Sequence, residues 1–123
     1  MLKHLFLLLL LINLFSCTYS QVKNIVTEDN WLALGEYQGE KGGIEHTLNE
    51  LQALSDKYSN GEVDYSAYQQ GYEKALIIYC QPQNAFQLGI SGKHYNGVCE
   101  RFPHGNEFRG DWEMAEKAKS GGM

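Results

Sequence analysis

Two cysteines and two histidines are the residues of this chain best suited to chemistry, and they are close together in the sequence. Cys80 and Cys99 lie on either side of His94, and His104 follows shortly after. Cysteine with histidine can bind zinc, whereas a cysteine pair alone can form a disulfide or act in thiol redox chemistry. Neither a CxxC nor an HxxxH spacing is present, and zinc sites commonly use such spacings. The choice among these chemistries depends on the compartment in which the chain folds.

The third cysteine, Cys17, follows a segment that is typical of exported precursors. After a weakly basic start, an unbroken apolar run extends from Leu5 to Ile12. A transmembrane helix needs about 20 apolar residues, so this run is too short and instead predicts a signal peptide over residues 1–16. The sequence Leu14-Phe15-Ser16-Cys17 resembles the bacterial lipobox. That resemblance implies that Cys17 becomes the new N-terminus and carries acyl chains.

A lipid on Cys17 determines where the protein is expected to reside. Each buried CH₂ group of an acyl chain contributes about 0.8 kcal/mol, so two or three chains hold a small domain on a membrane. Because residue 18 is Thr rather than Asp, the lipobox resemblance implies a lipid-anchored cell-envelope protein, at the outer membrane and facing the periplasm. The alternative is an ordinary signal peptide with cleavage nearby, which would leave Cys17 as a free thiol.

Export also favours one of the three chemistries open to the cysteine pair. In an oxidising envelope compartment, two cysteines in a small domain most simply form a disulfide. Closing a loop of about 20 residues would contribute about 3 kcal/mol to stability. We therefore expect a Cys80–Cys99 disulfide, and a zinc site or a redox pair remains as the alternative.

The net charge argues against two classes of partner. The 123 residues include 10 Lys and Arg against 15 Asp and Glu, which gives a formal charge of −5. Removal of Lys3 with the signal peptide leaves nine basic residues against fifteen acidic ones, a charge of −6. Nucleic acids need a basic face, and so does electrostatic docking on anionic lipid. We expect no nucleic-acid partner, and membrane attachment only through the lipid.

Hydrophobic periodicity predicts a mainly α fold in a single small domain over residues 27–119. Three to four short helices are expected, with a turn-rich segment closed by the disulfide, a tether at 17–26 and a flexible tail at 120–123. Thr27, Asp64 and Asn106 are suitable N-cap residues for three of these helices. Four helices are predicted, over residues 28–41, 44–58 and 65–79 and after Asn106, the last with Phe108, Trp112 and Ala115 inward. The turn-rich segment adds a helix of one or two turns over 85–88. Ile44 is expected on the inner face of the second helix.

Small and aromatic residues share faces of the first and third predicted helices. Glycine costs about 1 kcal/mol inside a helix relative to alanine, so three glycines there indicate a compensating gain. One explanation is close packing of helix 28–41 on helix 65–79, and another is a face kept open for a ligand. The candidate binding face comprises Trp31, Gly35, Gly39, Tyr68, Gly71, Tyr72 and Tyr95. A short pattern, Ala-aromatic-Gln-x-Gly, occurs at residues 67–71 and again at 85–89.

Several of these residues together resemble a family of bacterial lipoproteins. The pattern is Asp64-x₃-Tyr68-x₂-Gly71, then Tyr79-Cys80, then Gly89-x₂-Gly92-x₂-Tyr95-x-Gly97-Val98-Cys99, preceded by Trp31-x₃-Gly35-x₃-Gly39. It is similar to the family called domain of unknown function 2799, over about residues 27–112. The resemblance implies a small envelope lipoprotein and carries no activity with it.

The sequence contains no recognised catalytic motif. It has no G-x-S-x-G elbow, no H-E-x-x-H pair and no phosphate-binding loop. We therefore expect a non-catalytic binding or structural module, with an envelope protein or polymer as partner and no metal or cofactor besides the lipid on Cys17. The alternative is a small metal-dependent or hydrolytic envelope enzyme that uses His94 and His104 near Cys99.

Overall fold

The computed structural model describes residues 3 and 19–121, and it confirms the prediction of a mainly α fold. Apart from Lys3, the predicted signal peptide and Cys17 lie outside the described residues. No strand occurs in the described part of the chain. A helical segment at residues 19–27 is followed by α2 (Trp31–Glu40), α3 (Leu48–Tyr58), α4 (Tyr65–Tyr79), α5 (Pro82–Ile90), the 3-10 helix η1 (Val98–Arg101) and α6 (Gly105–Lys119).

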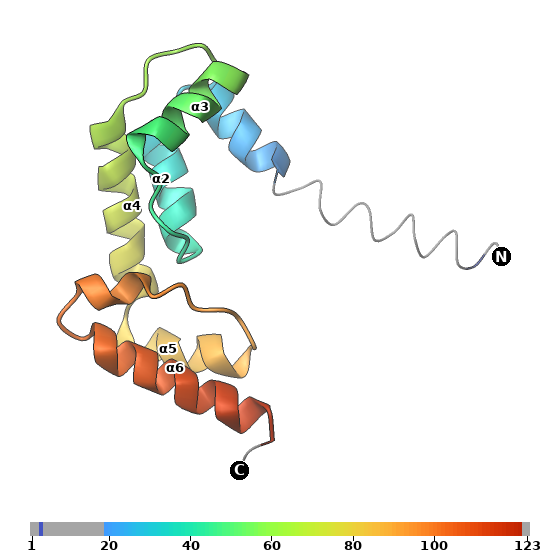
Figure 1. Ribbon diagram of the computed structural model, residues 1–123, viewed down its shortest axis with the longest axis vertical. Coiled ribbons are helices and arrows are strands. Elements are labelled where there is room, and N and C mark those ends of the chain that lie inside the picture. Colours follow the sequence, from blue (N-terminus) through green and yellow to red (C-terminus); the bar gives the residue numbers. More distant parts are fainter. Residues whose placement is uncertain (1–2, 4–18, 122–123) are drawn as a thin grey trace.

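The helices form two pairs, and the members of each pair run side by side in the same direction (Figure 1). The first pair is α2 with α4, and α3 lies in the connection between them. The second pair is α5 with α6, and η1 lies in their connection. Figure 1 shows the second pair lying across the end of α4. The two pairs therefore meet at an angle, where the chain passes from α4 into α5.

Glycines set the distance between the paired helices. A Cβ atom on Gly35 would lie 2.0 Å from the carbonyl oxygen of Tyr68, and one on Gly71 would lie 2.1 Å from that of Leu32. The second pair uses the same device, because a Cβ atom on Gly89 would lie 2.4 Å from the carbonyl oxygen of Trp112. These contacts are backbone against backbone. The predicted close packing of the first helix on the third is thus confirmed.

The segment expected to be a tether is helical and belongs to the core. Residues 19–27 form helix, and Val26 is buried with Val22 and Ile25 packed beside it. These three side chains have helical spacing. The prediction of a tether over 17–26 did not take this pattern into account. Tyr58 donates a hydrogen bond to the hydroxyl of Tyr19 at 2.6 Å, which joins this segment to α3.

Two helices begin later than predicted, because a nearby residue caps them better. The first begins at Trp31 rather than at 28, and the Asn30 side chain, not that of Thr27, accepts from the Ala33 amide at 3.1 Å. The second begins at Leu48, where Thr47 and Glu50 form a capping box. Residues 41–47 are therefore a loop. Ile44, expected to face inward, is 66% exposed.

The later helices fit the prediction in part. Helix α4 covers Tyr65–Tyr79 with Asp64 as its N-cap, as expected. Helix α5 starts at Pro82, a residue suited to the first turn, and it continues through Gly89 to Ile90. Helix α6 begins at Gly105, so Asn106 is not its cap. The predicted inward residues of α6 are placed correctly: Phe108 and Ala115 are buried and Trp112 is half-buried.

The predicted disulfide joins the two helix pairs. Cys80 at the end of α4 is bonded to Cys99 in η1, and both residues are fully buried. Gly105, at the start of α6, lies so close that a Cβ atom would be 2.2 Å from the Cys99 carbonyl oxygen. The disulfide therefore fixes the junction where α4, η1 and α6 meet.

We predict that Gly35→Ala destabilises the fold by about 3 kcal/mol, because the new methyl group forces α2 away from α4. Gly110→Ala is the matched control, since Gly110 lies in α6 and nothing surrounds its Cβ position within 4 Å. This control should raise stability by about 0.5–1 kcal/mol through helix propensity. Urea denaturation followed by circular dichroism measures both changes. Equal effects of the two substitutions would contradict the backbone contact.

Candidate functional site

The residues of the predicted binding face lie inside the molecule. Trp31, Tyr68, Tyr72 and Tyr95 are each at most 4% exposed, and Gly35, Gly39 and Gly71 are buried between α2 and α4. The prediction of an open aromatic face is therefore wrong. The glycines bring the two backbones into contact, and the aromatic rings fill the space beside that contact.

The hydroxyl groups of the buried tyrosines hold the loop at residues 41–47. Tyr68 accepts a hydrogen bond from the His46 amide at 2.8 Å, and Tyr72 donates one to the Gly43 carbonyl at 2.8 Å. Burial raises the pKa of Tyr68 to about 12. Burial also raises the pKa of Tyr72. These hydroxyls therefore stay protonated, and their hydrogen bonds stabilise the fold.

A charged cluster next to the disulfide ties η1 to α6. Tyr95 accepts a hydrogen bond from the Cys99 amide at 3.0 Å and donates one to Glu100, whose carboxylate also pairs with Arg109. Burial, followed by the bond to Glu100, raises the pKa of Tyr95. Partial burial of Glu100 opposes ionisation, but the hydrogen bonds from Tyr95 and Arg109 lower its pKa overall. Every member of the cluster thus has a partner within it.

The two histidines of the alternative metal or hydrolytic site have separate surroundings. His104 donates a hydrogen bond to the Cys80 carbonyl at 2.9 Å, whereas the ring of His94 meets the edge of Trp112, with centroids 6.5 Å apart. In the region 19–121, no three His, Cys, Asp or Glu side chains are grouped as metal ligands. His46, on the 41–47 loop, lies 3.6 Å from the carboxylate of Glu50.

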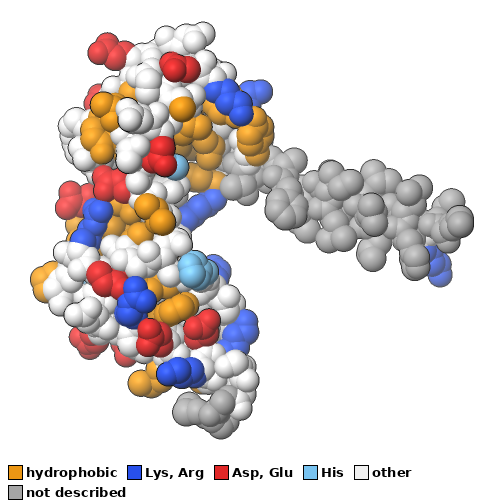
Figure 2. Space-filling view, viewed as in Figure 1, with side chains coloured by type: hydrophobic (Ala, Val, Ile, Leu, Met, Phe, Trp, Pro, Cys, Tyr) orange, Lys and Arg blue, Asp and Glu red, His pale blue; other side chains and the backbone are white. Residues whose placement is uncertain are grey.

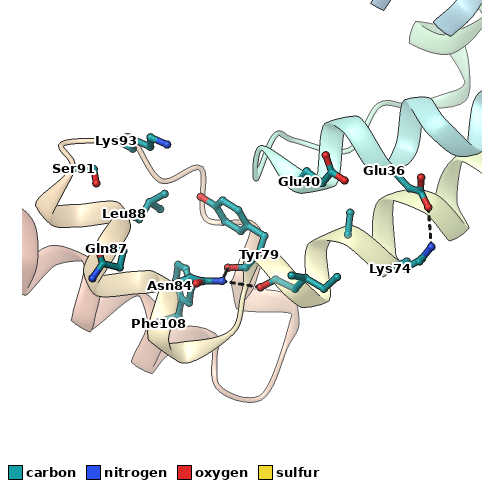
Figure 3. A pocket seen from close by; sticks show the side chains of 12 residues that line it. Glu36, Glu40, Lys74, Tyr79, Asn84, Gln87, Leu88, Ser91, Lys93 and Phe108 are labelled. Carbon is teal, nitrogen blue, oxygen red and sulfur yellow. Dashed lines mark hydrogen bonds and ion pairs between the residues drawn. The ribbon is translucent and has the colours of Figure 1, made fainter.

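A cleft of about 640 Å³ lies between the two helix pairs. Pockets of this size commonly hold ligands of small-molecule size. One wall comes from α2 and α4, and the other from α5 with the segment after it (Figure 3). The apolar part of the lining comes from Ala75, Ile78, Tyr79, Leu88 and Phe108, and the polar part from Glu36, Glu40, Lys74, Asn84, Gln87, Ser91 and Lys93.

Some polar groups in the cleft already have partners. Lys74 pairs with Glu36 at 3.0 Å on one wall. The Asn84 amide donates to the carbonyl oxygens of Ile78 and Tyr79, which closes the end of α4. The remaining polar side chains of the lining have no hydrogen-bond or ion-pair partner among the residues that the structure describes: Glu40, Tyr79, Gln87, Ser91 and Lys93.

The family comparison covers most of the same part of the chain. Residues 30–117 match a family described as "Protein of unknown function (DUF2799)". The chain belongs to this family. The match confirms the resemblance found in the sequence. Comparison with curated proteins and with solved structures found no match.

The matched segment of the DUF2799 domain includes all twelve residues that line the cleft. Sequence reasoning predicted none of them as site residues. They have no motif or common spacing, and they come together only because the disulfide junction places α5 beside α4. A predicted helix at 65–79 and another near 85–88 were correct as elements, but their spacing in the chain does not specify the angle between them.

We predict that Glu100→Gln weakens the dependence of DUF2799-domain stability on acid pH. A carboxyl whose pKa is lower in the folded chain stabilises the fold above its unfolded value, near 4.5. That contribution is lost as the pH falls through the folded-state value, so wild-type stability should fall between about pH 5 and pH 3. At neutral pH the variant should lose less than about 1 kcal/mol, because the pair is partly exposed.

The measurement is urea denaturation at several pH values, with Glu116→Gln as the control that removes an exposed carboxylate from α6, the helix that carries Arg109. The control should keep the wild-type pH dependence. Identical acid dependence in wild type and Glu100→Gln would contradict the assignment of the lowered pKa.

Proposed function

We propose that this protein is a non-catalytic binding protein of the cell envelope that holds its ligand in the cleft between the two helix pairs. The observation that carries the proposal is the set of five polar side chains in that cleft that have no partner among the described residues, above an apolar floor. The buried tyrosines, by contrast, use their hydroxyls within the fold. A binding surface is therefore better sought at the cleft than on the aromatic faces.

The envelope location is supported by the start of the chain and by the disulfide. We propose that residues 1–16 are removed, that Cys17 is acylated, and that the lipid holds the domain at the outer membrane, facing the periplasm. A buried disulfide suits an oxidising compartment. Within residues 3 and 19–121, none of the helices has the length and hydropathy that a bilayer crossing requires.

Binding rather than catalysis is supported by the chemistry of the lining. Nucleophilic catalysis pairs a nucleophile with a base in hydrogen-bond reach. Ser91 and Tyr79 are the hydroxyl groups of the cleft, and neither has such a partner among the described residues. His94 and His104, the residues of the alternative hydrolytic enzyme, are not part of the lining. We propose no metal or cofactor beyond the lipid.

The partner is proposed to be an envelope protein or polymer rather than a nucleic acid. The chain has a formal charge of −5. Acidic and basic side chains are interspersed on the face shown in Figure 2, without a basic stripe that could follow a phosphate backbone.

The location is tested by the intact mass of protein isolated from native membranes. We expect the mass of residues 17–123 plus a diacylglyceryl group and an N-acyl chain. We also expect two thiols to appear only after reduction in denaturant, because Cys80 and Cys99 are buried. An unlipidated chain, or two thiols free without reduction, would contradict the proposed anchor and compartment.

The binding surface is tested by photo-crosslinking in intact cells at two adjacent positions of α4. Ile78 lines the cleft and Ile77 does not, although the two are similarly exposed, at 58% and 53%. A photoreactive amino acid at 78 should give a discrete crosslinked species, and the same group at 77 should not. Crosslinks of equal yield at both positions, or at 77 alone, would contradict a ligand in the cleft.

A further inference from the structure

We infer that the cleft binds a short peptide in its zwitterionic form, with the ammonium group at Glu40, the carboxylate at Lys93 and an apolar side chain against the floor. This inference rests on the proposed function, since it narrows the ligand of the same cleft from an envelope protein or polymer to a short fragment of one with both termini free. It is carried by three observations: the two charges, the composition of the floor between them and the hydrogen bonds that hold the backbone near each charge.

The free charges of the cleft have opposite sign and lie on opposite walls. Glu40 is the last residue of α2, and Lys93 follows α5. Figure 3 shows them on either side of Tyr79. The other two ionic side chains of the lining, Glu36 and Lys74, neutralise each other at 3.0 Å. The cleft therefore offers a ligand that carries both charges one carboxylate and one ammonium that have no ion-pair partner in the described part of the chain.

The floor between these charges is apolar with polar groups at its side. Leu88 and Phe108 contribute apolar surface, and Tyr79 is half-buried between the walls. Burial raises the pKa of Tyr79, so its hydroxyl remains a neutral hydrogen-bond group. Gln87 and Ser91 add an amide and a hydroxyl, which suit the N–H and C=O groups of a peptide bond.

The backbone near each of the two charges is held by a hydrogen bond from a distant part of the chain. Glu40 lies two residues before Gly42, which has a φ of 62° and accepts a hydrogen bond from the Asn96 side chain at 3.0 Å. The carbonyl of Lys93 accepts a hydrogen bond from the Trp112 indole at 3.0 Å. The backbone at both positions is thus held before a ligand arrives, which lowers the part of the binding entropy that comes from ordering the main chain.

Other ligand classes match these observations less well. A phosphorylated or polyanionic ligand would face Glu40 without a counter-charge. A neutral sugar would make no use of Glu40 and Lys93, both of which are exposed. A zwitterionic phospholipid headgroup matches the charges, but its acyl chains need far more apolar surface than the floor of a 640 Å³ cleft provides. A short peptide matches both the charges and the volume.

The test is isothermal titration calorimetry of the purified full-length protein with L-leucyl-L-leucine. Two analogues serve as probes of the termini: N-acetyl-leucyl-leucine lacks the ammonium group and leucyl-leucine amide lacks the carboxylate. The variants are Glu40→Gln and Lys93→Met. The controls are Glu73→Gln and Lys117→Met, which remove exposed charges that do not line the cleft.

We expect the dipeptide to bind wild type and both controls alike. Each cleft variant should bind it about tenfold or more weakly, as the loss of one charge-assisted hydrogen bond predicts. Glu40→Gln should leave the affinity for the acetylated analogue unchanged, and Lys93→Met should leave that for the amide unchanged. Circular dichroism confirms that each variant is folded.

Absence of dipeptide binding at millimolar concentration would overturn the inference, and so would equal binding of capped and uncapped peptides. Binding of a phosphatidylethanolamine headgroup analogue in place of the dipeptide would also overturn it. In each of these cases a cleft-specific crosslink at position 78 would still stand, so failure of the peptide inference is distinguishable from failure of the proposed function.

Discussion

The contact between the backbones of α2 and α4 is the constraint on which the rest of this structure depends. Gly35 and Gly71 each lie against a carbonyl oxygen of the facing helix, at distances that leave no room for a Cβ atom. Each glycine weakens its own helix by about 1 kcal/mol, so the packing of the two helices has to offset that cost. Beside this contact Tyr68 and Tyr72 are buried, and their hydroxyls hydrogen-bond to the backbone of the 41–47 loop. The aromatic richness of the chain is thus explained by its core.

The second helix pair has the same kind of backbone contact. Together with the disulfide, the position of this pair creates the cleft. Gly89 lies against the Trp112 carbonyl as Gly71 lies against that of Leu32. The recurring Ala-aromatic-Gln-x-Gly pattern ends on these two glycines, although its aromatic residue is buried at Tyr68 and exposed at Phe86. The Cys80–Cys99 bond joins the pairs at the end of α4. Because the pairs meet at an angle there, their facing side chains enclose space, and this space is the candidate site (Figures 1 and 3).

Local signals in the sequence were enough to predict helices α2 to α6, but not the helical segment at 19–27, the ends of the helices or their assembly. The Asp64 cap and the spacing of residues 65–79 determine α4 by themselves, and the cysteine pair predicts its own bond. Thr27 and Asn30 are both suitable N-cap residues for the first predicted helix. Asn30 is the cap in the structure, where the helical segment before it buries Val26. The glycine stripes predicted a close contact, yet the same pattern also fitted an open face. Glu40 and Lys93 are 53 positions apart in a chain of 123 residues. Nothing in the sequence predicts that they line the same cleft, because this depends on the angle between the helix pairs.

The backbone contact is tested most directly by nuclear Overhauser effects in the isotope-labelled protein. The structure predicts strong effects between the α-protons of Gly35 and backbone protons at Tyr68 and Tyr72, and between those of Gly71 and backbone protons at Leu32 and Glu36. It also predicts that the ring signals of Tyr68 and Tyr72 resist a soluble paramagnetic agent, since both residues are at most 1% exposed. Absence of these effects, together with broadening of the two ring signals by the agent, would show an open aromatic face and contradict the account.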